Sequence, residues 1–178
     1  MKIIKNLFLL LGLLAAGTAC DDQFEDDLVR DNRPEVPVTF PGAMSVGFNP
    51  YYTASLKDTA EVTTGAAPTI TIQMSIPENS GRSIQEISKI VVGGTAINAG
   101  TVSNPRIAAY AGPLPVVGTS ATFTTPVRNF YLRAGRLSAA DRQALGSVGY
   151  VERALMFLIT LDDGSQIVPV QLRVRFTP

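Results

Sequence analysis

The stretch RALMFLITL (residues 153–161) is apolar at nearly every position, which is typical of a strand covered on both faces. The turn-forming sequence DDGS (residues 162–165) follows it directly. Residues 166–176 then alternate between apolar and polar side chains. The apolar positions, which we expect on one face, are Val168, Val170, Leu172, Val174 and Phe176. These segments predict a long β-hairpin. Because Pro169 lacks a backbone N–H, we expect the last strand to lie at an edge or to carry a bulge there.

Short β-type segments separated by Gly, Pro, Asn and Asp also precede this hairpin. The clearest is Thr69–Ile76, where isoleucine and methionine alternate with polar residues. The other segments predicted as strands are Glu86–Val92, Thr95–Asn98, Ala121–Thr125 and Val127–Arg133. We interpret Gly93-Gly94 as a tight turn between two of them, and Pro126 as an edge or a bend.

One short helix is expected among the strands. Ser138 and Asp141 have the spacing of a capping box, and Gly146 is a natural stop for the helix that follows. The element order predicts an all-β fold, an antiparallel two-sheet sandwich with one short helix. It resembles an immunoglobulin-like or fibronectin-like domain over residues 36–176. This resemblance rests on the strand pattern, because the cysteine pair and the core tryptophan of antibody domains are both missing.

Composition excludes several functional classes. The 178 residues include 15 basic, 15 acidic and no histidine side chains, so no clustered basic surface for nucleic acid is expected. Without histidine there is no Ser-His or Cys-His catalytic pair and no imidazole metal ligand. The phosphate-binding loop G-x-x-x-x-G-K-[ST] does not occur, so a nucleotide partner is not expected either.

The first twenty residues have the order of a secretory signal. Lys2 and Lys5 precede the apolar run Leu7–Ala16, and small residues lead to Cys20, the single cysteine. The junction GTAC (residues 17–20) resembles a bacterial lipobox, although Gly17 stands where leucine is commonest. The resemblance implies that Cys20 carries a diacylglycerol and an N-acyl chain after cleavage, and no other cofactor is expected. The alternative is an ordinary signal peptide cut near Ala19, which would leave a free thiol.

An acidic segment, DDQFEDD (residues 21–27), follows the cysteine. Such a segment cannot bury enough apolar surface to order itself, so we expect a disordered linker. It resembles the surface-export signal of Bacteroidota lipoproteins, which implies an outer-membrane protein facing the cell exterior. A periplasm-facing spacer is the alternative. The predicted organisation is a signal peptide over 1–19, the lipidated cysteine and acidic tether over 20–35, and the β-sandwich over 36–178.

Candidate site residues in the sandwich are few. Tyr51, Tyr52 and Tyr110 lie in turn-rich segments, where tyrosine rings can bind sugars or protein partners; packing against the sheet is the alternative. The acidic residues each fit a turn, a cap or a solvated strand face. Asp162 and Asp163 fit a turn better than a calcium site, because no further ligands are spaced around them. We therefore predict no catalytic and no metal-binding residue.

The predicted function is that of a non-catalytic, lipid-anchored cell-envelope protein. It would serve as a surface binding or accessory module of an outer-membrane assembly, with the membrane and a glycan or protein as partners. A structural or adhesive protein that assembles by strand-edge pairing is the alternative. An envelope enzyme acting on glycosides is a remote third hypothesis.

Overall fold

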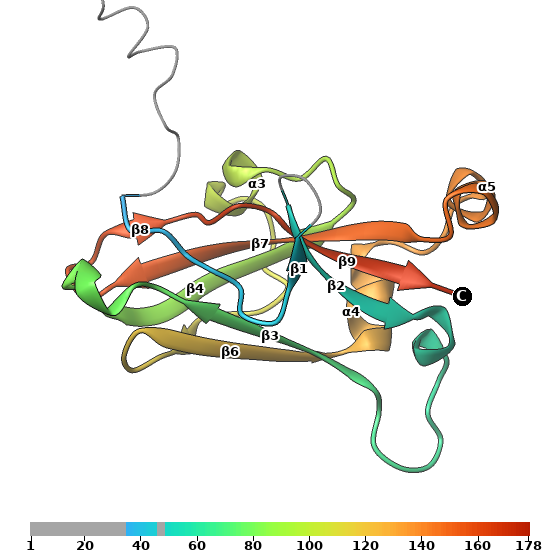
Figure 1. Cartoon of the computed structure of the whole chain (residues 1–178), viewed down its shortest axis with the longest axis horizontal. Coiled ribbons are helices and arrows are strands. Elements are labelled where there is room, and N and C mark those ends of the chain that lie inside the picture. The colour runs from blue at the N-terminus through green and yellow to red at the C-terminus, as the bar shows by residue number, and fades with distance from the viewer. Residues whose placement is uncertain (1–34, 46–48) are drawn as a thin grey trace, which may run out of the picture. The chain divides into compact units, whose positions relative to one another are not determined.

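The computed structural model describes residues 35–45 and 49–178 (Figure 1). These residues belong to one compact unit, Arg33–Pro178. The signal sequence, Cys20 and the acidic segment 21–27 lie outside the described residues, so their proposed roles remain predictions. In the described part of the chain, no helix has the length and apolar character needed to cross a membrane.

Most of the described chain forms strands in two sheets, so an all-β fold is present as expected. The strands of the larger sheet, in spatial order, are β1 (Met44–Ser45), β2 (Pro50–Ser55), β9 (Leu172–Thr177), β7 (Val151–Leu161), β4 (Ile84–Gly93) and β5 (Leu114–Pro115). The seventh strand, β8 (Gln166–Ile167), pairs with β7. All these pairs are antiparallel except β2 and β9, which are parallel.

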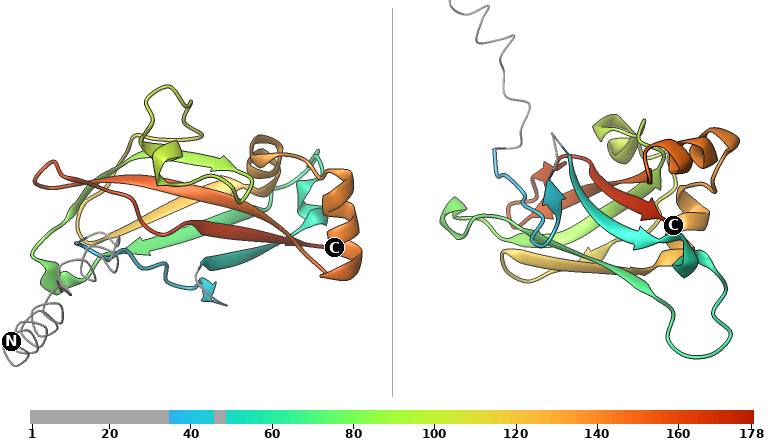
Figure 2. Two further views of the ribbon diagram at one scale, coloured as in Figure 1. Left: turned by 90° about the horizontal axis from the view of Figure 1, so that it is seen from above. Right: turned by 45° about the vertical axis from the view of Figure 1, so that its right-hand side comes forward.

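The smaller sheet consists of β3 (Thr69–Ser75) and β6 (Ser120–Pro126), which are antiparallel and lie on one side of the larger sheet (Figure 2). We call the face of the larger sheet toward this pair its inner face. The helices are η1 (Leu56–Thr59), η2 (Glu78–Ser80), α3 (Ala99–Ser103), α4 (Val127–Ala134) and α5 (Ala139–Ser147).

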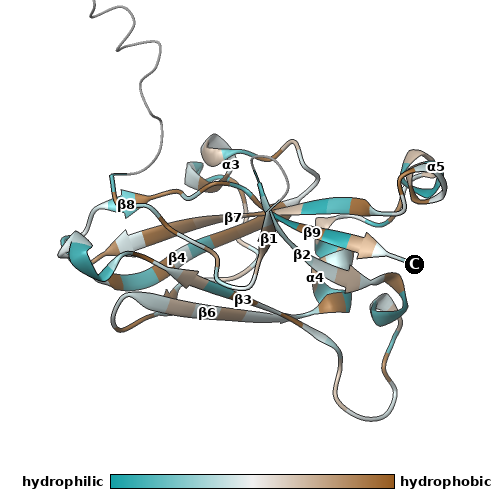
Figure 3. Cartoon of the chain, viewed as in Figure 1, coloured by the Kyte–Doolittle hydropathy of each residue, from teal (hydrophilic) through white to brown (hydrophobic). Residues whose placement is uncertain are grey.

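The main core fills the space between the two sheets. In β3, every second side chain is buried in this core and the side chains between them are exposed to solvent. This alternation confirms the strand predicted over Thr69–Ile76. Phe157 of β7 lies at the centre, fully buried, with its ring 5.9 Å from that of Phe40 and 6.4 Å from that of Phe123. Figure 3 shows the hydrophobic residues along β4 and β7.

β7 is buried on its outer face as well. Its inner residues join the main core, whereas Met156 and Leu158 join a second cluster on the outer face. Val102 of α3 is fully buried in this second cluster, so α3 covers the outer face of β4 and β7. The double cover explains why RALMFLITL (residues 153–161) is apolar at nearly every position, and the turn predicted over 162–165 follows it.

The prediction of a strand over Val127–Arg133 is wrong, because this segment belongs to helix α4. Pro126 ends β6 and precedes the helix, a position where a missing N–H costs nothing. Val127, Phe130 and Ala134 are the buried residues of α4, at the spacing of one helical face. The segment is too short for its apolar residues to distinguish the two-residue period of a strand from the 3.6-residue period of a helix. The buried residues of the structure have the helical spacing.

Two further predictions differ from the structure, one of a strand and one of a helix end. The strand predicted over Thr95–Asn98 is absent, because Asn98 accepts a hydrogen bond from the N–H of Thr101 and caps α3. The capping box of Ser138 and Asp141 in α5 is confirmed. This helix nevertheless continues past Gly146 to Ser147. The described chain thus contains three α-helices where one was expected.

The final strand is interrupted around Pro169, where an irregularity was expected. The predicted common face is wrong before Leu172, because Val168 packs in the outer cluster and Val170 is 45% exposed. From Leu172 onward the alternation holds, and the apolar residues enter the main core. β9 is no edge strand, because β2 pairs with it on the side opposite β7.

Replacing Phe157 with alanine should lower the free energy of unfolding by about 3–5 kcal/mol, because a fully buried ring leaves a cavity between the two sheets. Val117→Ala is the control, since Val117 is 98% exposed and should change stability by less than about 0.5 kcal/mol. Urea unfolding followed by circular dichroism measures both. Equal stability of the two variants would contradict this description of the core.

Candidate functional site

The three tyrosines singled out in the sequence do not form one surface. Tyr110 packs edge-on against Phe123 and Phe130, with ring centres 6.3 and 6.5 Å away. Its hydroxyl shares a hydrogen bond with the hydroxyl of Thr125. Burial raises the pKa of the Tyr110 phenol, and the bond to Thr125 only partly offsets this. Tyr110 therefore packs against the core, which was the alternative to a binding role.

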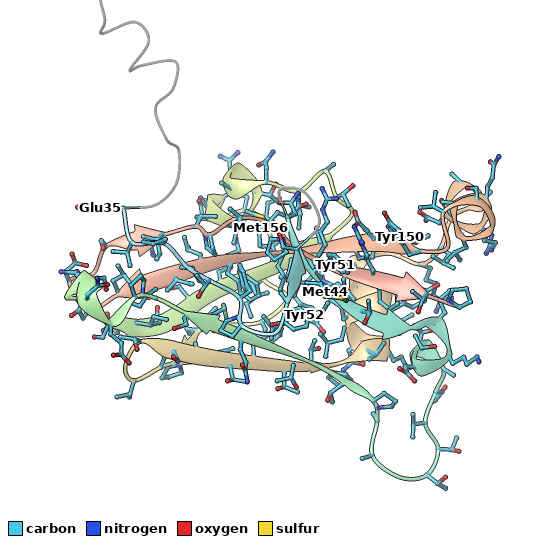
Figure 4. All side chains as sticks on the ribbon, in the orientation of Figure 1. Glu35, Met44, Tyr51, Tyr52, Tyr150 and Met156 are labelled. Carbon is cyan, nitrogen blue, oxygen red and sulfur yellow. The ribbon has the colours of Figure 1, made fainter. Side chains whose placement is uncertain are left out.

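Tyr52 also follows the packing alternative. Its ring contacts the main core, and its hydroxyl donates a hydrogen bond of 2.6 Å to the carbonyl of Pro41. This bond ties the chain before β1 to β2. Figure 4 labels the positions of Tyr51, Tyr52 and Tyr150 on the ribbon.

Tyr51 has a different environment, on the outer face of the larger sheet. The guanidinium carbon of Arg175 lies 3.6 Å from the centre of the Tyr51 ring and 4.3 Å from that of Tyr150. Both distances are within the range of a cation–π interaction. Tyr51 is buried by this arrangement although it takes no part in the main core. We call Tyr51, Arg175 and Tyr150 the tyrosine–arginine cluster.

Glu152 of β7 fixes the charged part of this surface. Its carboxylate accepts a hydrogen bond of 2.8 Å from Nε of Arg175 and one of 2.5 Å from Nη1 of Arg173. Burial lowers the pKa of Arg175, but the hydrogen bond and the charge of Glu152 raise it more, so the net shift is upward. The register places Glu152 opposite Arg175 in the β7–β9 ladder. The three groups form a charge-paired layer beside the tyrosine–arginine cluster.

An open groove of about 550 Å³ adjoins this layer. It lies between the turn after β4, helix α5 and the start of β7. Residues that line it include Thr95, Ala144, Val148, Tyr150 and Glu152. Val148 is 59% exposed, so an aliphatic side chain and an aromatic ring border the same opening. A groove with these groups suits a ligand that has both apolar and polar faces.

Arg153 and Asp141 hold one wall of the groove. Nη2 of Arg153 donates to Asp141 at 2.8 Å, and Nε donates to the carbonyl of Gly135 at 2.8 Å. The hydrogen bond from Arg153, with help from the backbone N–H of Ser138, lowers the pKa of Asp141 to about 2. This pair ties the α4–α5 connection and α5 to β7. Both carboxylates of the groove are therefore occupied by arginine.

The two aspartates considered for calcium lie elsewhere. Nε of Arg82 is 3.2 Å from Asp162, and its guanidinium also contacts Asp163. The turn interpretation fits this arrangement. Within residues 35–45 and 49–178, no three Cys, Asp or Glu side chains lie close enough together to hold a metal ion.

Sequence reasoning selected Tyr51 but missed its partners Tyr150, Glu152, Arg173 and Arg175. A partial signal was available, since Arg173 and Arg175 alternate with apolar residues on the last strand and therefore share a face. The stacking of Tyr51 on Arg175 depends on the parallel pairing of β2 with β9, which no local pattern indicates.

Comparisons with protein-family models, with curated proteins and with solved structures yield no match.

Asp141→Asn should lower the free energy of unfolding at pH 7 by about 1 kcal/mol, because the amide keeps the cap but loses the charge-assisted bond to Arg153. The folded pKa of about 2 lies below the usual aspartate pKa of 3.8, so the stabilisation is present above pH 4 and lost as the pH falls toward 2. Urea unfolding from pH 7 to pH 2 measures the difference. A gap between wild type and variant that stays constant down to pH 2 would contradict this role of Asp141.

Proposed function

We propose that this protein is a non-catalytic, lipid-anchored module of the cell envelope that binds a glycan or peptide in the groove between the turn after β4, helix α5 and the start of β7. The observation that carries the proposal is the groove beside the tyrosine–arginine cluster, where exposed Val148 and half-buried Tyr150 adjoin Glu152 and its two arginines. Arg173 and Arg175 share the one carboxylate of Glu152, so these ion pairs fix the shape of the surface and leave it with an excess of one positive charge.

A non-catalytic role is supported by the state of the groove carboxylates. Glycoside hydrolysis requires one carboxylic acid with a raised pKa facing a second carboxylate. In the groove, Asp141 has a lowered pKa, and Glu152 accepts hydrogen bonds from two arginines. Asp141 is therefore ionised near neutral pH, and each oxygen of the Glu152 carboxylate is engaged by an arginine.

The lipid anchor is proposed from the sequence around Cys20. A basic start, an apolar run and a small-residue junction end at the single cysteine of the chain. A single acyl chain binds a membrane only marginally, whereas two or more chains together with a thioether-linked glycerol anchor it stably. We propose the outer membrane as the location, with the sandwich facing the cell exterior, on the resemblance of residues 21–27 to surface-export signals.

We also propose that the sandwich is immunoglobulin-like. In immunoglobulin domains strand B neighbours strand E in one sheet, and strands C, F and G are neighbours in the other. The pairing of β3 with β6 and the order β4–β7–β9 match this arrangement when the strands are taken in chain order. The bridge from Thr39 to Ser75 of β3 would correspond to strand A. This match supports the assignment without the cysteine pair of antibody domains.

Cells that express the full chain should incorporate palmitate into the wild type and not into Cys20→Ala. Protease treatment of intact cells should then digest the wild-type sandwich. The measurement is fluorography of labelled protein before and after shaving. Wild type without label would refute the anchor, and digestion only after lysis would refute the outward orientation.

Tyr150→Ala should weaken binding of a ligand found on glycan and peptide arrays by about five- to thirtyfold, because truncation of a central aromatic contact costs about 1–2 kcal/mol. Tyr52→Phe is the matched control, since it removes only the hydroxyl that bonds Pro41 and leaves the groove unchanged. Fluorescence titration of the wild type and both variants gives the dissociation constants. A ligand that Tyr150→Ala binds as tightly as the wild type would show that the groove is not the binding site.

A further inference from the structure

Among residues 35–45 and 49–178, the outer edge of β6 in the smaller sheet has no partner, whereas the outer edge of β3 carries the bridge from Thr39 to Ser75. β6 pairs with β3 along one side, and no other strand in this part of the chain pairs with the opposite side. Figures 1 and 2 show β6 at the rim of its layer. A strand edge of this kind presents N–H and C=O groups to which another strand can bind.

The β3–β6 register identifies the groups on this edge. Ser75 donates to Thr39 at 3.0 Å and accepts from it at 2.8 Å, so its backbone faces away from β6 and its pair with Ser120 is not hydrogen-bonded. Hydrogen-bonded and non-hydrogen-bonded pairs alternate along an antiparallel ladder. The alternation therefore directs the N–H and C=O groups of Thr122 and Thr124 away from β3, toward the open edge.

This edge lacks the usual protection against pairing. Proteins shield sheet edges with very short strands, with charged side chains or with proline. The end strands β1 and β5 of the larger sheet have two residues each. β6 has seven residues, SATFTTP, none of them charged, and its single proline is the last of them. Its exposed side chains alternate as Ser120, Thr122 and Thr124.

We infer that β6 pairs with β6 of a second copy of this chain, antiparallel and about a twofold axis at Phe123. In this register Thr122 lies opposite the partner's Thr124, and each such pair exchanges both N–H···O=C bonds. The two β3–β6 pairs then form one continuous sheet. Pro126, which has no N–H, falls opposite the partner's Ser120 at the end of the ladder, where little is lost.

A second copy fits this edge because the edge is self-complementary. A twofold interface places the same surface opposite itself, so any charged residue near the axis would face its own copy. The uncharged sequence of β6 avoids this repulsion. The inference rests on the proposed anchor in one respect: copies held on one membrane surface meet at a raised effective concentration, which favours a small interface.

The test uses two full-length variants expressed together, Thr122→Cys and Thr124→Cys. Residues opposite one another in a hydrogen-bonded pair have Cα atoms about 5.5 Å apart, which a disulfide can bridge. Each variant alone would place identical cysteines about 8–9 Å apart, which is too far. With mild oxidant, the mixture should give a species of twice the mass at about ten times the yield of either variant alone. Wild type controls for any free Cys20.

A second comparison keeps the surface charge constant. Thr122→Lys with Thr124→Lys places like charges opposite one another across the proposed axis, and should raise the dissociation constant of the dimer by about tenfold or more. Thr71→Lys with Gln73→Lys adds the same charges on the same face but on β3, and should leave the dimer unchanged. Analytical ultracentrifugation in detergent gives the constants, and circular dichroism confirms that each variant is folded.

The outcomes separate this inference from the proposed function. Failure of the mixed cysteine variants to cross-link, or their cross-linking to a chain of different mass, would overturn pairing between copies while leaving the ligand groove and the anchor untouched. Equal cross-linking by a single variant would overturn the register. Loss of palmitate labelling with intact cross-linking would overturn only the anchor.

Discussion

The burial of β7 on both faces is the constraint on which the rest of the domain depends. A strand that is apolar on both faces must be covered twice, because each exposed apolar side chain would forfeit the free energy of its burial. The β3–β6 layer covers the inner face, and α3 covers the outer face only over part of the strand. Helix α3, which follows β4, supplies this second cover.

The position of the candidate site follows from where this second cover ends. Along the outer face of β7, Leu158 and Met156 lie in the apolar cluster with α3, whereas Glu152 lies among arginines. The change from apolar to polar occurs within a few residues of one strand. The tyrosine–arginine cluster and the groove lie at the polar end, where the sheet is covered by paired charges and aromatic rings in place of a helix.

The sequence predicted those elements whose signal is local. Two strands were predicted from the side chains of a single segment, by alternation over Thr69–Ile76 and by continuous apolar character over 153–161. Both predictions are confirmed. The strand prediction over Val127–Arg133 was wrong because seven residues span fewer than two helical turns. A segment of that length is too short to distinguish the helical period from that of a strand. The site could not be assembled in advance, because Tyr51 and Arg175 meet only through the parallel pairing of β2 and β9.

The two surfaces of the domain differ in what they can recognise. The groove presents side chains at the start of β7 and on helix α5, whereas β6 presents backbone groups at the edge of the other layer. A ligand in the groove would therefore leave the β6 edge accessible. If two copies pair along β6 and the proposed anchor holds, the pair would carry two grooves on one membrane surface. Two linked sites bind a repetitive ligand such as a glycan more tightly than either site alone, provided that the ligand spans both. Weak contacts in a shallow groove are then sufficient for capture, and no deep pocket is needed.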